Sequence, residues 1–297
     1  MPARTPSVTP PSPRTRPRRA RRLRALLAVG IAALVTGASG CAGAVAGADT
    51  GPSSANARTA PTTPVDTTPV APSPPDPARR VLVLGDSTMV DVAPALLAAF
   101  GAAGSEVVDA SRPGVGLSRF GFREGPWSPE SEWSAIVDAE RPDLTIVMLG
   151  VWDMPTIDRD GLAAYVEPTR RAMAVLARAG RVLWLSTPTE PGRPDWPTDQ
   201  VFEAVAATFP NVSYAEVDAA VRAPDGTYPP SFVALDGSVV RLRKDDGFHF
   251  CADGAERLAD EVNRLAVVHG LARRTPAGWE DGAWRASERY DDPACLG

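Results

Sequence analysis

Short apolar runs recur along the second part of the chain and predict buried strands. Each run is nearly continuous in apolar residues, which is typical of parallel strands covered on both faces. The runs are VLVL (81–84), EVVDA (106–110), LTIVMLG (144–150), RVLWLS (181–186) and VSYAEVD (212–218). Between them, apolar residues fall at helical spacing, most clearly over 162–176 and 255–266. This alternation predicts an α/β fold, a three-layer flavodoxin-like sandwich around a five-stranded parallel sheet.

Three local features qualify this pattern. Pro168 lies inside the first helical stretch, so we expect that helix to be kinked or to start later. Residues 219–248 contain the pair Asp236-Gly237, which predicts a hairpin within a long loop over the functional site. Residues 270–297 show neither an apolar run typical of a strand nor helical spacing of apolar residues, and they predict an irregular tail.

The first part of the chain indicates an export leader followed by a tether. Residues 1–41 begin with an arginine-rich segment, continue with the apolar stretch 25–35 and end in small residues, the order of a secretory signal. The apolar stretch is too short to span a bilayer, which takes about twenty residues. Residues 42–78 are rich in Ala, Gly, Pro, Ser and Thr and predict an extended tether. Residues 79–297 remain as one domain, long enough to bury a substantial core.

The end of the leader, ASGC, is similar to a bacterial lipobox, in which Cys41 becomes the lipidated first residue. Simple cleavage and an uncleaved anchor are the alternatives. In each case we expect an exported protein, extracellular or held at the cell envelope. It would contact a membrane only through its leader or its lipid.

The distribution of charge argues against a nucleic-acid partner. The overall formal charge is −5, although residues 1–40 carry eight arginines and no acidic residue, so the domain itself is strongly acidic. Nucleic acids require a basic face. We expect a monomer that binds no nucleic acid.

Export also decides how the three cysteines are interpreted. If Cys41 is lipidated or removed, Cys251 and Cys295 remain in an oxidising compartment. We predict a disulfide between Cys251 and Cys295. Two buried or free thiols are the alternative.

Ser87 follows the first predicted strand in the stretch VLVLGDSTMV. Ligands of open parallel sheets bind beyond the C-terminal ends of the strands, which makes Ser87 a candidate nucleophile. The alternative is that Ser87 or Thr88 only caps a helix that begins near Asp91. A Gly-Asp-Ser tripeptide alone does not decide between these interpretations.

A carboxylate and a histidine near the end of the domain favour catalysis. In DDGFHFCADGAERLA, Asp246 stands three residues before His249 and just ahead of the last long helix. A serine nucleophile needs a base that takes its proton and a carboxylate that orients the base. One loop can supply both groups, although His249 as a structural histidine is the alternative. His269, the other histidine, is expected only to complement a helix end.

Two further strand ends hold candidates for an oxyanion hole. After the second strand, in DASRPGVG, Gly114 or Gly116 can present a backbone N–H that no side chain obstructs. The third strand ends in LGVWD, which contains Gly150, Trp152 and Asp153.

Taken together, these motifs resemble the SGNH hydrolase superfamily of GDSL-like esterases and lipases. The resemblance covers about residues 80–268. It implies that Ser87 is the nucleophile, that His249 is the general base and acid, and that Asp246 orients the histidine.

The resemblance also implies that the N–H groups of Ser87 and Gly114 bind the oxyanion, with Gly116 as the fallback. One position departs from the family, whose third motif is Gly-x-Asn-Asp: Trp152 stands where the asparagine would donate. An indole has one N–H donor and no acceptor, so Trp152 either replaces the amide or lines the pocket. The segment MLGVWDMPTIDRDG looks like the SGNH domains of bacterial acyltransferases that O-acylate cell-surface glycans.

We therefore expect a serine esterase or O-acyltransferase that acts on carboxylic esters, acetyl esters above all, of cell-envelope glycans. Hydrolysis and transfer share the acyl-enzyme, so the sequence does not separate them. The chemistry needs no metal and no cofactor. Asp86, Trp152 and Asp153 are expected to contact the substrate. The alternative is a non-catalytic SGNH-like module that binds glycan or assists an acyltransferase partner.

Aromatic residues add one open question. Four tryptophans are candidates for a sugar-stacking surface or, equally, for core and loop anchors. They are Trp127, Trp133, Trp152 and Trp196. A flavodoxin-like binder of nucleotide or phosphate is disfavoured, because no glycine-rich phosphate loop follows any predicted strand.

Overall fold

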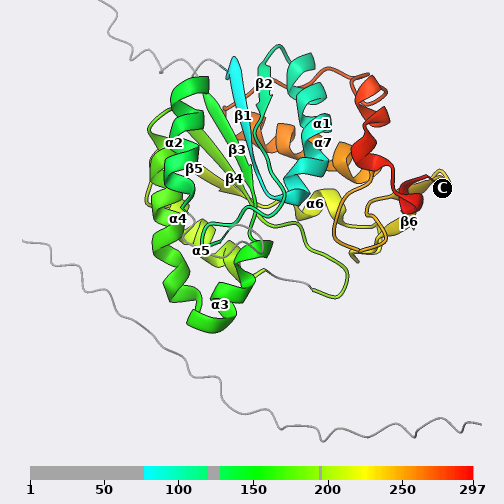
Figure 1. Cartoon of the computed structure of the whole chain (residues 1–297). Helices are drawn as coiled ribbons and strands as arrows, with labels where there is room; N and C mark the ends of the chain where they lie inside the picture. The colour runs from blue at the N-terminus through cyan, green and yellow to red at the C-terminus, as the bar shows by residue number, and fades with distance from the viewer. Residues whose placement is uncertain (1–76, 120–127, 194–195, 297) are drawn as a thin grey trace, which may run out of the picture. The chain divides into compact units, whose positions relative to one another are not determined.

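Five parallel strands form a sheet in the order β2-β1-β3-β4-β5 (Figure 1). The computed structural model describes residues 77–119, 128–193 and 196–296. The strands are β1 (Arg80–Gly85), β2 (Glu106–Asp109), β3 (Leu144–Met148), β4 (Arg181–Leu185) and β5 (Val212–Ala215). This sheet confirms the predicted α/β class and the position of each predicted strand.

Alternate residues of the strands face two separate hydrophobic cores. The helices are α1 (Ser87–Ala102), α2 (Pro129–Glu140), α3 (Met154–Asp160), α4 (Leu162–Ala177), α5 (Pro197–Ala206), α6 (Asp218–Val221) and α7 (Ala252–Val268). Val81 and Val83 of β1 pack in the core that contains α1 and α7. Leu82 and Leu84 pack in the core that contains α2, α4 and α5. Figure 1 shows these two helical layers on opposite faces of the sheet.

Two helices differ in detail from the sequence-based expectation. Helix α1 begins at Ser87, earlier than the predicted start near Asp91, because Asp86 supplies a cap directly after the strand. Helix α4 runs from Leu162 to Ala177 with Pro168 inside it, so it does not start later as one alternative had it.

The predicted hairpin around Asp236-Gly237 is present. It pairs β6 (Ser231–Val233) with β7 (Val239–Arg241) in antiparallel register. Gly237 takes the positive φ of +88° that such a turn needs.

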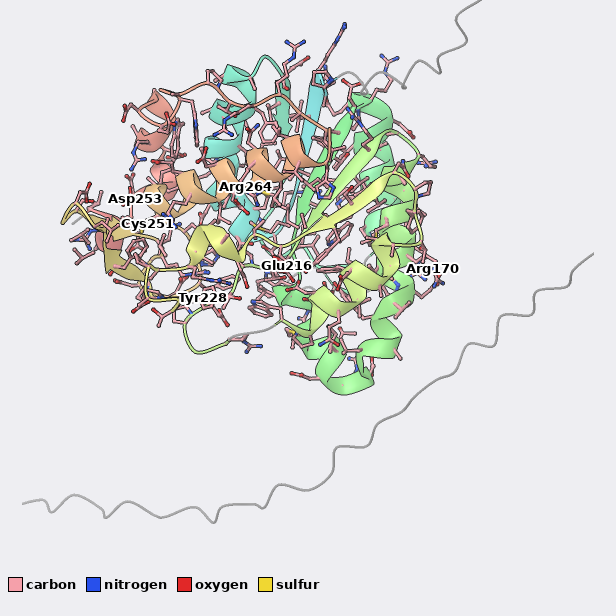
Figure 2. The ribbon with its side chains drawn as sticks, turned by 180° about the vertical axis from the view of Figure 1, so that it is seen from behind. Arg170, Glu216, Tyr228, Cys251, Asp253 and Arg264 are labelled. Atoms are coloured by element: carbon pink, nitrogen blue, oxygen red, sulfur yellow. A yellow bond between two sulfur atoms is a disulfide. The ribbon has the colours of Figure 1, made fainter. Side chains whose placement is uncertain are left out.

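The C-terminal tail consists of short 3-10 turns packed against the domain. These are η2 (Ala283–Ala286), η3 (Glu288–Tyr290) and η4 (Pro293–Cys295). The predicted disulfide joins Cys295 to Cys251, with a Cα–Cα distance of 5.3 Å. Cys251 lies directly before α7, where Figure 2 labels it. The tail is therefore covalently tied to the segment that follows His249.

Several predictions fall on residues that the structure does not describe. The leader (1–41), its Cys41 and nearly all of the tether (42–78) lie outside the described residues. Among the helices that are described, none has both the length and the apolar character that crossing a membrane requires.

Candidate active site

The C-terminal edge of the sheet gathers the segments predicted to carry chemistry. Gly85 in β1 pairs with Met148 in β3, and Val83 in β1 pairs with Asp109 in β2. Predicted site residues follow each of these three strands. Their convergence at one edge is a consequence of parallel strand order, since all strands end on the same side.

Each residue of the Gly-Asp-Ser motif has a different structural role at the junction of β1 and α1. A Cβ on Gly85 would lie 2.1 Å from the carbonyl oxygen of Met148, so only glycine fits. Asp86 caps α1, because its Oδ1 accepts hydrogen bonds from the Thr88 N–H (3.0 Å) and hydroxyl (2.7 Å). Ser87 is left half-buried as the first helical residue, and its hydroxyl has no hydrogen bond to any part of the chain that the structure describes. Capping therefore belongs to Asp86 and leaves the Ser87 hydroxyl available.

Asp246 and His249 form a directed pair in the loop before α7. The His249 Nδ1 lies 2.5 Å from Asp246 Oδ2, while Asp246 Oδ1 accepts from the N–H groups of Phe248 (2.8 Å) and His249 (2.9 Å). Burial raises the pKa of Asp246, but the hydrogen bonds from His249 and the backbone outweigh it, so the pKa lies below its ordinary value. An ionised Asp246 makes Nδ1 the donor and leaves Nε2 as the basic nitrogen.

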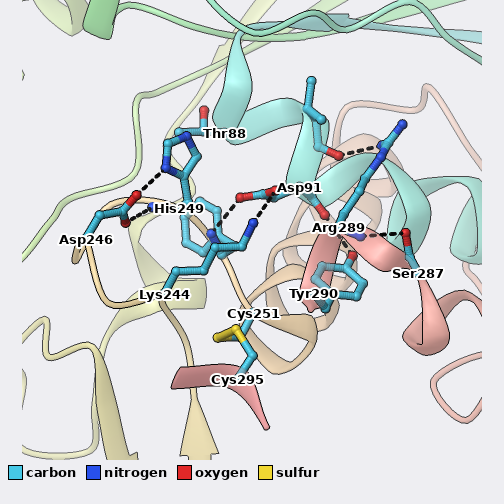
Figure 3. A network of polar contacts seen from close by, with 12 residues as sticks. Thr88, Asp91, Lys244, Asp246, His249, Cys251, Ser287, Arg289, Tyr290 and Cys295 are labelled. Atoms are coloured by element: carbon cyan, nitrogen blue, oxygen red, sulfur yellow. Dashed lines mark hydrogen bonds and ion pairs between the residues drawn. A yellow bond between two sulfur atoms is a disulfide. The ribbon is translucent and has the colours of Figure 1, made fainter. Parts of the chain in front are cut away.

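Hydrogen bonds join this loop to the first turns of α1. The Phe250 N–H donates to Asp91 Oδ2 and the Lys244 ammonium donates to Asp91 Oδ1, each at 2.9 Å. In Figure 3 the ring of His249 lies between Asp246 and Thr88, the residue after Ser87. Sequence reasoning used Asp91 only as a helix start and missed this contact. The available signal was its spacing of one helical turn from Ser87.

The loop after β2 separates the two glycine candidates. Gly114 is buried with a φ of +86°, and its N–H has no hydrogen bond among the described residues. The Gly116 N–H instead donates to the carbonyl of Arg119 at 2.9 Å. The Ser87 N–H, in the first turn of α1, likewise lacks a partner in the described part of the chain. The geometry favours Ser87 and Gly114 as donors over Gly116.

Asp86 and Asp153 are both fully buried, so the expectation that they contact substrate needs correction. The Asp153 carboxylate accepts from the N–H groups of Leu117 (2.9 Å) and Ser118 (2.7 Å) and from the Tyr165 hydroxyl (2.6 Å). Burial raises the pKa of both carboxyls, that of Asp86 to about 6. These side chains bind backbone and neighbouring hydroxyls instead, and Asp153 ties the end of β3 to the loop after β2.

The tryptophans take different positions. Trp133 and Trp196 are only 2% and 4% exposed, so they are buried anchors rather than a stacking surface. Trp152 is half-buried in the short 3-10 helix η1 (Val151–Asp153) after β3. Trp127 lies outside the described residues. No group of side chains with the character of a metal site is found within residues 77–119, 128–193 and 196–296.

Comparison with known proteins gives one family and several structural likenesses. The family model described as "Protein of unknown function (DUF459)" matches residues 80–265. No curated protein matches. Est24, a carbohydrate acetylesterase from Sinorhizobium meliloti, is similar at 15% identity and a TM-score of 0.47, over 64% of this chain and 99% of that chain.

Two further solved structures show likenesses of the same order. The periplasmic domain of a lipopolysaccharide acetyltransferase from Salmonella ser. Paratyphi A has 11% identity and a TM-score of 0.46, over 64% of this chain and 84% of its own. A catalytic mutant of Axe2, an acetylxylan esterase from Geobacillus stearothermophilus, has 17% identity and a TM-score of 0.45, over 68% and 100%. The fold and the matched family agree with the SGNH resemblance that the motifs indicate.

Proposed function

The chain belongs to the DUF459 family of proteins of unknown function, and we propose that this member is an SGNH-type serine esterase or O-acyltransferase. One observation carries the proposal. The Asp246–His249 pair sits on a loop that is hydrogen-bonded, through Asp91, to the helix that begins with Ser87. A nucleophile, a base and an orienting carboxylate thus come from two segments that are held against each other.

The proposed reaction proceeds through an acyl-enzyme. The Ser87 oxygen attacks the acyl carbon of an ester while His249 takes the serine proton, and the ionised Asp246 stabilises the resulting imidazolium. The oxyanion receives hydrogen bonds from the N–H groups of Ser87 and Gly114. The alkoxide leaves with the proton returned by His249. A water molecule or a sugar hydroxyl, deprotonated by His249, then attacks the acyl-enzyme and regenerates Ser87.

Trp152 is the residue that separates this site from the usual family pattern. It stands where the family has an asparagine that donates to the oxyanion. Loss of one such donor typically lowers turnover by about a hundredfold or more. We propose that two backbone donors form the oxyanion hole and that Trp152 lines the acyl pocket.

The proposed substrate is an O-acyl, and specifically O-acetyl, ester of a cell-envelope glycan. The support is the likeness of MLGVWDMPTIDRDG to glycan O-acyltransferase domains, together with the export signal that residues 1–41 predict. The Cys251–Cys295 disulfide supports export, since such bonds persist in oxidising compartments. Residues 1–41 would direct export, with Cys41 as a lipid anchor, and residues 42–78 would hold the monomeric domain away from the membrane.

The decisive experiment combines a fluorophosphonate probe with an ester assay. We expect mass spectrometry to find the probe on Ser87, and we expect Ser87→Ala to abolish p-nitrophenyl acetate hydrolysis. Ser131→Ala, an exposed serine on α2, is the matched control and should keep full activity. Equal hydrolysis by wild type and Ser87→Ala, without label on Ser87, would refute catalysis by this site.

A second assay separates hydrolysis from transfer. Wild-type protein is given an acetyl donor with and without a glycan acceptor, and acetate release is compared with acetylated glycan. Transfer at a rate above that of acetate release would assign an acyltransferase.

The second candidate is a non-catalytic glycan-binding module, and Trp152 at the asparagine position is the observation that favours it. It predicts glycan binding that is unchanged in Ser87→Ala and no label from the probe.

A further inference from the structure

Asp91 connects the helix that begins with Ser87 to the loop that carries His249. We propose that Asp91 is a positioning residue that sets the distance between these two groups. This inference rests on the proposed function, because it assigns Asp91 a task in the Ser87–His249 reaction. Asp91 would not touch the substrate. It would act through the Phe250 N–H, the group next to His249 in the chain.

The hydrogen bond between Asp91 and Phe250 joins two positions that are each close to a reacting group. Asp91 lies one helical turn after Ser87, so the two side chains project from the same side of α1. Phe250 directly follows His249, and its N–H donates to Asp91 Oδ2 at 2.9 Å. A single carboxylate therefore links a position one turn from the nucleophile with a position one residue from the base.

The contact is buried and held on both oxygens. Asp91 is 4% exposed, and Oδ1 accepts from the Lys244 ammonium at 2.9 Å. Both of these partners belong to the loop of residues 244–250. Among the described residues, these are the hydrogen bonds that join that loop to α1. A buried, charge-assisted pair of this kind is stiff, because water is not available to replace it.

Other contacts of the loop act elsewhere. The guanidinium of Arg243, the residue just before this loop, donates to the carbonyls of Phe248 and Thr189, which ties the loop to the segment after β4. The Lys244 N–H donates to the His249 carbonyl at 2.8 Å, within the loop. These bonds shape the loop, whereas those of Asp91 place it against Ser87.

The C-terminal tail offers a matched control at the same position. The Tyr290 hydroxyl donates to the main-chain carbonyl of Asp91 at 2.7 Å, and in Figure 3 Asp91 lies between Tyr290 and the ring of His249. Tyr290→Phe removes a buried hydrogen bond from the same residue without touching the Phe250 contact. It therefore reports the effect of lost stability alone.

The test compares Asp91→Ala with Tyr290→Phe in the complete chain. We expect Asp91→Ala to lower kcat for p-nitrophenyl acetate by about tenfold or more, because small displacements of reacting groups are costly, with KM nearly unchanged. Fluorophosphonate labelling of Ser87 should slow in proportion. Asp91→Asn keeps an oxygen that can accept from Phe250 and should restore most of the rate. Tyr290→Phe should keep kcat within about twofold, although it too lowers the melting temperature.

Amide hydrogen exchange provides a readout that does not depend on activity. The Phe250 amide should exchange faster in Asp91→Ala than in wild type, and at the wild-type rate in Tyr290→Phe. If Asp91→Ala does not fold, Asp91→Thr replaces it, because threonine fills more of the space. Its hydroxyl sits one covalent bond closer to the main chain than the Asp91 carboxylate oxygens and does not reach the Phe250 amide. If wild type itself is neither active nor labelled, the proposed function fails, while the exchange data still decide whether Asp91 holds the loop.

The proposal is overturned if the alanine or threonine variant matches Tyr290→Phe in both kcat and Phe250 exchange. It is also overturned if Asp91→Asn has as low a kcat as Asp91→Ala, because the hydrogen bond from Phe250 would then not account for the loss of activity.

Discussion

Arg289 in the C-terminal tail donates a hydrogen bond to the main-chain carbonyl of Val90 in α1. In a regular helix this carbonyl would accept from the residue four positions later, which here is Pro94 and has no N–H. The neighbouring Tyr290 donates to the next carbonyl, that of Asp91. The tail thus binds α1 where proline interrupts the helical ladder.

This relationship predicts a coupling between Arg289 and Pro94. Arg289→Ala should lower the free energy of unfolding by about 1–2 kcal/mol, because a carbonyl loses a charged donor. In a Pro94→Ala background the new N–H can satisfy Val90, so the cost of Arg289→Ala should fall by about 1 kcal/mol. Urea unfolding of the four proteins measures the cycle. Equal costs in the two backgrounds would show that the proline does not create the demand for Arg289.

Two glycines, one just before α1 and one in its last turn, should respond in opposite directions. Gly85→Ala would put a Cβ 2.1 Å from the Met148 carbonyl, and we expect a loss of about 3 kcal/mol or insoluble protein. Gly101, in the last turn of α1, has nothing within 4 Å of an added Cβ. Gly101→Ala should therefore stabilise the helix by about 0.5–1 kcal/mol. Thermal unfolding checks both, and destabilisation by Gly101→Ala would contradict the described packing.

Asp86 should make the protein less stable as the pH rises. Burial raises its pKa from an ordinary value of 3.8 to about 6. Between these values the unfolded state releases a proton that the folded state retains, so the free energy of unfolding falls with rising pH, by about 3 kcal/mol for this group. Asp86→Asn keeps an acceptor for Thr88 but has no charge. We expect it to be more stable than wild type at pH 7 and to lose this advantage near pH 4. Unfolding curves from pH 4 to pH 8 that run parallel for the two proteins would refute the prediction.

The disulfide should hold the tail on the domain. The Cys251–Cys295 bond spans 44 residues, for which loop-closure entropy predicts about 4 kcal/mol of stabilisation. Cys295→Ser should lower the melting temperature and expose the segment after α7 to limited proteolysis. Reduced wild type is the matched control and should behave as the variant does. Unchanged proteolysis in both would mean that Arg289 and Tyr290 hold the tail without the covalent bond.

Local sequence was sufficient where the structure depends on local periodicity or on the chemistry of a residue type. The apolar runs such as VLVL mark the strands, because a strand buried on both faces must be apolar at every position. The spacing of Asp246 and His249 likewise predicts their pairing, since both groups lie on one short loop. The hairpin at Asp236-Gly237 follows from the backbone preferences of two residues.

Tertiary structure decided what depends on contacts between distant segments. The choice between Gly114 and Gly116 rests on which N–H the carbonyl of Arg119 occupies, and nothing in the local sequence states this. The residues around Asp86 and Asp153 in the sequence do not distinguish a carboxylate that binds substrate from one that is buried. Only the packing of the folded chain shows that both are buried.

Asp91 is the clearest case. Its partner Phe250 lies 159 residues away in the chain. Periodicity and residue chemistry act over one turn or one strand, so the sequence by itself determined the strands, the helices and the reactive residue types. Only the folded sheet, which brings α1 beside the loop before α7, decided which of those residues meet.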